Sequence, residues 1–150
     1  IDESGRLRIL GRLKEEFKTA KGKYVYPGPI EKLLSMSTLF ESVCVLGAGM
    51  ANPCLLAVLV PELRESARNA REREQIQARL QSDIDRVNQS LEAHEQIRFV
   101  VLCQQPWTIE NGLLTPTLKV RRAALEERFA HKFMTWETSR QRVLWEEAAA

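Results

Sequence analysis

The segment 111–122, NGLLTPTLKVRR, places one lysine directly after a turn in which a proline separates two threonines. A lysine on a loop offers a compact positive charge and three hydrogen-bond donors. Pro116 restricts the loop backbone, so less conformational entropy is lost when Lys119 is held in one place. A fixed cation of this kind can stabilise negative charge that develops beside it. The residues alone equally allow a solvated lysine that precedes a helix.

A second group of lysines lies in the segment 11–27, GRLKEEFKTAKGKYVYP. The segment predicts the end of a strand followed by a β-loop around residues 21–23. Neither 11–27 nor 111–122 has the apolar spacing of an amphipathic helix. Both segments therefore place their lysines in loops rather than on helix faces.

Other kinds of site have little support in the sequence. His94 and His131 have no cysteine or carboxylate partner at ligand spacing, which predicts that no metal is bound. No Gly-x-Ser-x-Gly motif is present, and no Cys–His arrangement points to nucleophilic hydrolysis. The Gly-Ala-Gly at 47–49 lacks the following helix of a dinucleotide site, and a hairpin turn explains it.

Composition indicates one globular domain with a real core. The 150 residues are 44% apolar and 28% charged, with a net charge of +2. Three cysteines in apolar segments, an odd number, favour a reducing compartment and hence the cytoplasm. Glu15 and Glu16 interrupt the basic loop, which argues against a nucleic-acid partner. We expect at most peripheral contact with a membrane. Because the first residue is Ile1 and not Met, we also expect the chain to be a piece of a longer protein.

Hydrophobic spacing predicts the elements that position these loops. The predicted order is βαββαβα, which indicates an α+β fold with a small mixed sheet flanked by helices. Apolar residues from Ile76 to Leu91 recur at helical spacing, with an ion pair between Asp83 and Arg86 on the polar face. The predicted elements are strands at 7–10, 42–47, 54–60 and 98–103, helices from Pro29, over 76–91 and over 120–136, and a fraying helix at the end of the chain.

The two lysine segments resemble motifs of one enzyme family. GRLKEEFKTAKGKYVYPGPIE is similar to the hinge segment of the adenylate-forming enzymes, which include acyl-CoA synthetases, luciferases and peptide-synthetase adenylation domains. ENGLLTPTLKVRR resembles the C-terminal lysine motif of that family, and its LTPTLK is most like the long-chain fatty acyl-CoA synthetases. The two segments follow in the order expected for the family.

The resemblance implies that residues 1–150 form the C-terminal lid domain, with an N-terminal hinge strand and acceptor-side loop over 1–27 and an α+β body over 28–150. A large N-terminal domain that binds ATP and the acyl group would be absent from this chain, which would be inactive alone. The implied enzyme is an ATP-dependent, AMP-forming fatty acid–CoA ligase that makes acyl-AMP and then acyl-CoA by domain rotation. It would use ATP, Mg²⁺ and coenzyme A, none of them held tightly by this domain.

The resemblance also assigns roles to single residues. Lys119 would be the catalytic cation of adenylation, and Lys18 would face the active site during thioester formation. Arg121 and Arg122 could bind the coenzyme A phosphates, with a basic helix start equally compatible. The remaining assignments are Lys14 as the hinge, Arg12 for the nucleotide, and Gly22, Lys23 and Tyr24 for the acceptor loop.

Two other functions remain open from the sequence. A lid of the fatty acyl-AMP ligase type would load an acyl carrier protein in place of free coenzyme A. A nucleic-acid binder would use the basic loop 11–24 with Tyr24 and Tyr26, although its stacking surface is small.

Overall fold

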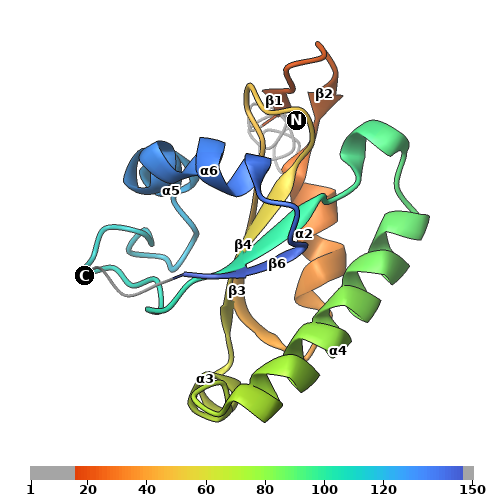
Figure 1. Ribbon diagram of the computed structural model, residues 1–150. Helices are drawn as coiled ribbons and strands as arrows, with labels where there is room; N and C mark the ends of the chain where they lie inside the picture. The colour runs from red at the N-terminus through yellow and green to blue at the C-terminus, as the bar shows by residue number, and fades with distance from the viewer. Residues whose placement is uncertain (1–15, 147–150) are drawn as a thin grey trace.

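A four-stranded mixed sheet forms the centre of the protein, a computed structural model of which describes residues 16–146. Its strands, β3 (Phe40–Leu46), β4 (Cys54–Leu59), β5 (Phe99–Leu102) and β6 (Val143–Trp145), lie side by side in that order. β3 and β4 form an antiparallel hairpin, and the other two pairs are parallel. This arrangement confirms the predicted α+β fold with a mixed sheet (Figure 1).

Helices cover both faces of this sheet (Figure 1). Two of them, α2 and α4, pack on one face, and α5 and α6 pack on the other. The described helices are α2 (Pro27–Ser35), α3 (Pro61–Ser66), α4 (Ala70–Gln89), α5 (Arg122–Phe129) and α6 (Phe133–Thr138), with short 3₁₀ turns η1 (Ala93–Glu95) and η2 (Ala130–Lys132).

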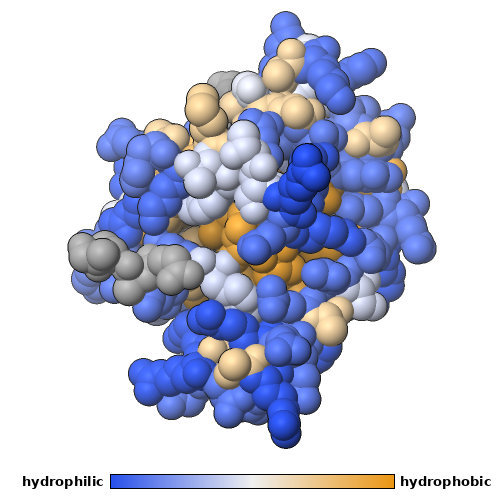
Figure 2. All heavy atoms as spheres, viewed as in Figure 1, coloured by the Kyte–Doolittle hydropathy of each residue, from blue (hydrophilic) through white to orange (hydrophobic). Residues whose placement is uncertain are grey.

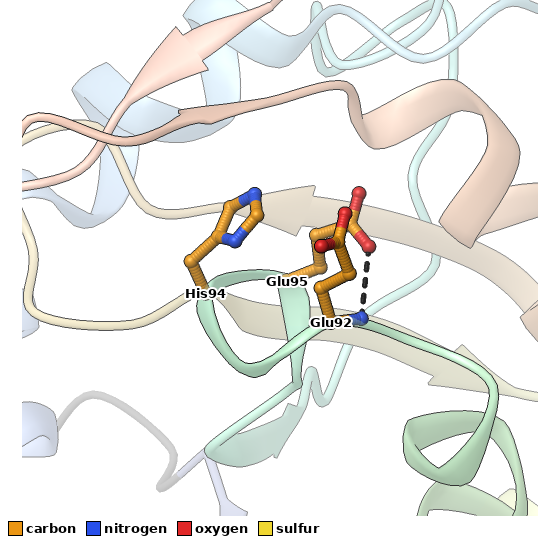
Figure 3. A group of neighbouring side chains, drawn as sticks. All are labelled: Glu92, His94 and Glu95. Carbon is orange, nitrogen blue, oxygen red and sulfur yellow. Dashed lines mark hydrogen bonds between the residues drawn. The ribbon is translucent and has the colours of Figure 1, made fainter.

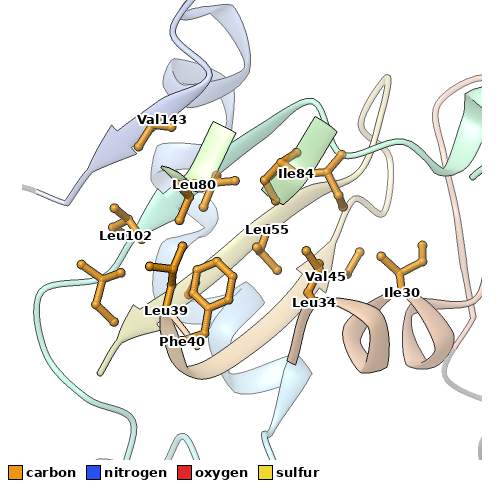
Figure 4. Packing of buried hydrophobic residues seen from close by; sticks show 14 of the residues in the cluster. Ile30, Leu34, Leu39, Phe40, Val45, Leu55, Leu80, Ile84, Leu102 and Val143 are labelled. Carbon is orange, nitrogen blue, oxygen red and sulfur yellow. The ribbon is translucent and has the colours of Figure 1, made fainter. Parts of the chain in front are cut away.

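Alternation along the strands divides the interior into two cores. In β4, Leu55 and Leu59 point to the α2/α4 face, while Leu56 and Val58 point to the α5/α6 face. All six residues of β4 are buried, as expected for a strand covered on both sides. Figure 4 shows the first of these cores, where Leu55 meets side chains from α2 and α4.

The longest helix, α4, forms for the reasons that its sequence suggests. The Asn69 side chain caps its N-terminus by accepting hydrogen bonds from the first-turn backbone N–H groups of Arg71 and Glu72. Ile76, Leu80 and Ile84 are buried on one face, as their spacing predicts. The expected ion pair between Asp83 and Arg86 is present at 2.8 Å, on the solvent side.

The end of the chain differs from its prediction. The single helix expected over 120–136 is interrupted by η2, although Leu125, Phe129 and Trp136 still enter the same core. The strand β6 follows where no strand was predicted, because three residues give too short a pattern to detect. Glu146 is not helical, so the expected terminal helix is wrong there; residues 147–150 and the predicted strand 7–10 lie outside the described residues.

The three cysteines are free and buried. Loss of hydration on burial raises the pKa of the Cys103 thiol to about 12, and burial raises the pKa values of Cys44 and Cys54 in the same direction. Among the described helices, none is both long and apolar enough to cross a bilayer.

Candidate functional site

Lys119 occupies the last position of a tight turn that closes on Thr115. The Leu118 N–H donates to the Thr115 carbonyl (2.8 Å), and the Thr115 N–H donates to the Lys119 carbonyl (2.8 Å). The Lys119 N–H in turn donates to the Thr115 hydroxyl (3.0 Å). Pro116 sits at the second position, where its fixed φ suits such a turn. The backbone N–H and carbonyl of Lys119 are therefore both hydrogen-bonded to Thr115, while its side chain is exposed.

The hairpin formed by β1 (Phe17–Lys18) and β2 (Tyr24–Val25) contains a turn of the same construction. The Thr19 N–H donates to the Lys23 carbonyl (2.9 Å), and the Gly22 N–H donates to the Thr19 carbonyl (3.0 Å). The Lys23 N–H donates to the Thr19 hydroxyl (3.2 Å). Sequence analysis missed this equivalence, although the shared Thr-x-x-x-Lys spacing could have shown it.

The fourth position of each turn requires a left-handed backbone. Gly22 supplies it at φ 82°, and Leu118 adopts it at φ 66°. In residues 16–146, Leu118 is alone among non-glycine residues in having a positive φ, and its side chain is 67% exposed. The conformation costs a residue with a Cβ about 1–2 kcal/mol. The hydrogen bonds of the turn must therefore impose it.

A second layer of hydrogen bonds anchors the base of the Lys119 turn. The Asn111 side chain accepts from the Thr108 N–H (3.0 Å) and the Leu113 N–H (3.2 Å). The Arg121 guanidinium donates to the Gly112 carbonyl (2.7 Å), on the other side of the turn. Asn111 was not singled out from the sequence. Arg121, expected at a phosphate or at a helix start, is the N-cap residue of α5, and its side chain braces this loop.

The β1–β2 hairpin is fastened to the loop between β3 and β4. The Ala20 N–H donates to the Met50 carbonyl (2.8 Å), and the Gly49 N–H donates to the Lys18 carbonyl (3.0 Å). A Cβ at Gly47 would lie 2.8 Å from the Phe17 ring, so only glycine allows this close packing. The glycines around 47–49 therefore serve a hairpin and its neighbour, in agreement with the turn predicted there.

Polar side chains surround the exposed face of the hairpin. The Lys18 ammonium lies 5.6 Å from the centre of the Tyr24 ring, within range of a cation–π contact. A hydrogen bond and the negative charge of Glu16 raise the pKa of the exposed Tyr26 phenol. Lys18, Gly22, Lys23 and Tyr24 thus share one small hairpin, whereas Arg12 and Lys14 lie outside the described residues.

The two lysine turns are not brought together. Figure 1 shows the hairpin at the top of the molecule and the loop that precedes α5 at its left side. The hairpin and this loop are separated within the plane of the view, so the two turns lie at different places on the domain.

Arg122 occupies a structural position. Its guanidinium makes a two-pronged ion pair with Glu31, at 2.6 Å and 3.2 Å, and donates to the Val45 carbonyl at 3.1 Å. The side chains of both charged residues are about four-fifths buried, with exposures of 18% and 20%. This pair connects α5 with α2 and β3. Of the two expected roles of Arg122, the structure favours a basic residue at the start of a helix over phosphate binding, because its guanidinium already binds Glu31 and the Val45 carbonyl.

His94 does have acidic neighbours, contrary to the sequence analysis. Ligand atoms of Glu92, His94 and Glu95 lie within 4.8 Å of one another (Figure 3). The two carboxylates, however, cap η1: the Glu92 side chain accepts from the Glu95 N–H, and Glu95 accepts from the Glu92 N–H at 3.1 Å. This reciprocal capping accounts for the cluster.

A family comparison decides the relationship. The model for the AMP-binding enzyme C-terminal domain matches residues 16–135. The chain belongs to this family. Both Thr-x-x-x-Lys turns lie within the matched region, so the resemblance seen in the two motifs is confirmed at the level of the family.

Among curated proteins, the chain is similar to long-chain acyl-CoA synthetases. Long chain acyl-CoA synthetase 6, peroxisomal, of Arabidopsis thaliana is 34% identical over 145 aligned residues, covering 84% of this chain. Long-chain-fatty-acid–CoA ligase 5 of Rattus norvegicus is 31% identical over 140 residues, with the same coverage. The chain spans about a fifth of the length of each of these relatives (20%).

Solved structures agree with the fold. The adenylation domain of a carboxylate reductase from Mycobacterium chelonae superposes with a TM-score of 0.73 over 85% of this chain and 20% of its own, at 24% identity. A carboxylic acid reductase domain from Segniliparus rugosus, in complex with AMP and a co-purified carboxylic acid, gives a TM-score of 0.69 over 83% of this chain and 20% of its own, at 22% identity.

Proposed function

We propose that the chain is the C-terminal lid domain of an ATP-dependent fatty acid–CoA ligase. The observation that carries the proposal is the exposed Lys119 on a turn closed by three hydrogen bonds, in a chain similar to long-chain acyl-CoA synthetases. A large N-terminal domain would supply the ATP and acyl sites, with Mg²⁺ neutralising charge on the departing pyrophosphate. The cytoplasmic location stays a prediction from the free cysteines.

In the first half-reaction, a carboxylate oxygen attacks the α-phosphorus of ATP. The bond from that phosphorus to the oxygen bridging the α- and β-phosphates breaks, which gives acyl-AMP and pyrophosphate. No proton has to be removed, so the need is for positive charge where the carboxylate meets the phosphate. Lys119 would supply it, and its anchored backbone lowers the entropy lost in placing the ammonium.

In the second half-reaction, the thiol sulfur of coenzyme A attacks the acyl carbonyl carbon and AMP leaves with the electron pair of the broken C–O bond. The hairpin would then face the active site, with Lys18 toward the reacting groups and Lys23 and Tyr24 near the acceptor. Gly22 would leave room for the pantetheine arm. We assign the hinge of this rotation to Lys14 and a nucleotide contact to Arg12.

The test separates the two half-reactions in the complete enzyme. With Lys119→Ala we expect acyl-AMP formation to fall on the order of 10²–10³-fold, as for one oxyanion donor. Thioester formation from preformed acyl-AMP should change little. Lys32→Ala, which removes an exposed lysine of α2, is the matched control. Equal losses in both half-reactions would reject the assignment of Lys119.

The same preparation of the complete enzyme can test whether the acceptor is a carrier protein rather than coenzyme A. A fatty acyl-AMP ligase would transfer the acyl group to the phosphopantetheine of a holo carrier protein in preference to coenzyme A. The proposed CoA ligase is supported if turnover with coenzyme A is well above turnover with the carrier protein. If turnover with the carrier protein is higher, the function is that of a fatty acyl-AMP ligase.

A further inference from the structure

The turn at the end of the β1–β2 hairpin places Lys23 where the other lysine turn places Lys119. Each turn begins at a threonine and ends at a lysine four positions later. In each, the lysine N–H donates to the threonine hydroxyl, at 3.2 Å and 3.0 Å, and the lysine carbonyl accepts from the threonine N–H, at 2.9 Å and 2.8 Å. Because both lysine backbones are held in the same way, Lys23 rather than Lys18 is the structural counterpart of Lys119.

The Lys23 ammonium is available to a ligand. The residue is exposed, and within residues 16–146 no ion pair or ring contact engages it. Lys18, in contrast, lies opposite Tyr24 in the hairpin, with its ammonium 5.6 Å from the centre of the Tyr24 ring. Figure 2 shows hydrophilic side chains that project at the top of the molecule, where Figure 1 places the hairpin.

The two proposed half-reactions need positive charge at the same oxygen atom. In the first step, an oxygen of the carboxylate forms its bond to the α-phosphorus. In the second step, the carbon–sulfur bond forms and the bond from the acyl carbon to that oxygen breaks, with its electron pair passing to AMP and the thiol proton to water. The phosphate of AMP gains one negative charge, and an ammonium beside it stabilises this charge without gaining or losing a proton.

We propose that Lys23 is a catalytic residue of the second half-reaction, in which its ammonium stabilises the phosphate of the departing AMP. The inference rests on the proposed function and adds a second lysine to the role given to Lys18. Thr19 is then a positioning residue for Lys23, as Thr115 is for Lys119, since each hydroxyl accepts a hydrogen bond from the N–H of its own lysine. Rotation of the domain would exchange one turn for the other at a single oxygen.

The experiment measures the two half-reactions separately in the complete enzyme. For Lys23→Gln, we expect the rate of thioester formation from preformed acyl-AMP to fall on the order of 10²-fold, as for one oxyanion donor, while acyl-AMP formation does not change. The loss should appear in kcat rather than in the KM for coenzyme A. It should be as large with pantetheine, which has the thiol but no phosphates. Lys21→Gln, which removes an exposed lysine of the same turn, is the matched control.

A second pair of variants tests the positioning role of the two threonines. Valine has the shape of threonine without the hydroxyl, so it fits the site of Thr19, which is 5% exposed. Thr19→Val should slow thioester formation roughly 3-fold to 10-fold, as for one lost neutral hydrogen bond, and should leave acyl-AMP formation unchanged. Thr115→Val should slow acyl-AMP formation and spare the thioester step. Equal losses in both half-reactions for each variant would reject the positioning role.

The outcomes separate the inference from the proposed function. An unchanged rate of thioester formation in Lys23→Gln would overturn the inference while leaving the ligase intact. A loss confined to the KM for coenzyme A and absent with pantetheine would also overturn it, because Lys23 would then contact only the nucleotide of the acceptor. So would an equal loss in Lys21→Gln, since any positive charge on the hairpin would then suffice. If the unmodified enzyme forms no thioester with either acceptor, the proposed function itself fails, and the inference fails with it.

Discussion

Two residues in equivalent turns show what single positions contribute to this domain. Gly22 and Leu118 both adopt a left-handed backbone just before a lysine, but only one of them is the residue type that favours it. The sequence motif predicted a stiff loop before Lys119 through Pro116. It could not reveal the positive φ of Leu118, because leucine seldom adopts that conformation and tertiary hydrogen bonds impose it here.

Substitutions at Gly22 and Leu118 should change the free energy of unfolding in opposite directions. Gly22→Ala should lower the free energy of unfolding by about 1 kcal/mol, since a Cβ fits the space but not the φ angle. Leu118→Gly should raise it by less than about 1 kcal/mol, because relief of strain is partly offset by the greater entropy of the unfolded chain. Urea denaturation of the chain measures both. A destabilised Leu118→Gly would show that the leucine side chain makes contacts that outweigh the strain.

The buried thiols should make the stability of the protein fall at high pH. Because the pKa of Cys103 is raised to about 12 from 9.0, the folded state keeps its proton where the unfolded state loses it. The stabilisation is therefore complete below pH 9 and declines by about 1.4 kcal/mol per pH unit between pH 9 and 12. Urea denaturation at pH 8 and pH 10 should show a smaller decline for Cys103→Ala than for the unmodified chain. Parallel declines would contradict the assignment.

At the scale of elements, the hydrophobic pattern predicted the helices and strands that are long enough to show a repeating spacing, and it missed the shortest strand. The buried stripe of α4 and the all-apolar β4 are long enough to be recognised, and they define the two faces of the sheet. The strand β6 has three residues and is fixed by pairing with β5, which lies some forty positions earlier. Likewise, Arg122 adjoins a functional motif in sequence, but its partner Glu31 comes from a distant helix.

The Glu31–Arg122 ion pair should contribute substantially to the packing of α5 against the sheet. Glu31→Gln should lower the free energy of unfolding by about 2–3 kcal/mol, because a largely buried guanidinium then loses its charge partner. The matched control is Glu41→Gln, whose pair with Arg64 is more exposed and should contribute less than about 1 kcal/mol. Urea denaturation of both variants decides the matter, and equal small losses would contradict a structural role for Arg122.

At the scale of the whole molecule, the fold separates the two lysine turns to which we assign two chemical steps. The sheet and its loops hold the hairpin at one end and the Lys119 turn at another side (Figure 1). A domain of this kind can present one turn and then the other by rotating as a rigid body. The sequence indicated both turns and their order, but only the structure shows that they have the same hydrogen-bond pattern and lie at different places on the domain.

The most direct test is a pair of crystal structures of the complete enzyme, one with a non-hydrolysable acyl-adenylate analogue and one with coenzyme A added. We predict that the Lys119 ammonium lies about 3 Å from an oxygen of the adenylate phosphate or acyl group in one orientation of the domain. In the other orientation, the β1–β2 hairpin should replace it at the active site. A Lys119 that stays remote from the nucleotide in every orientation would contradict the central claim.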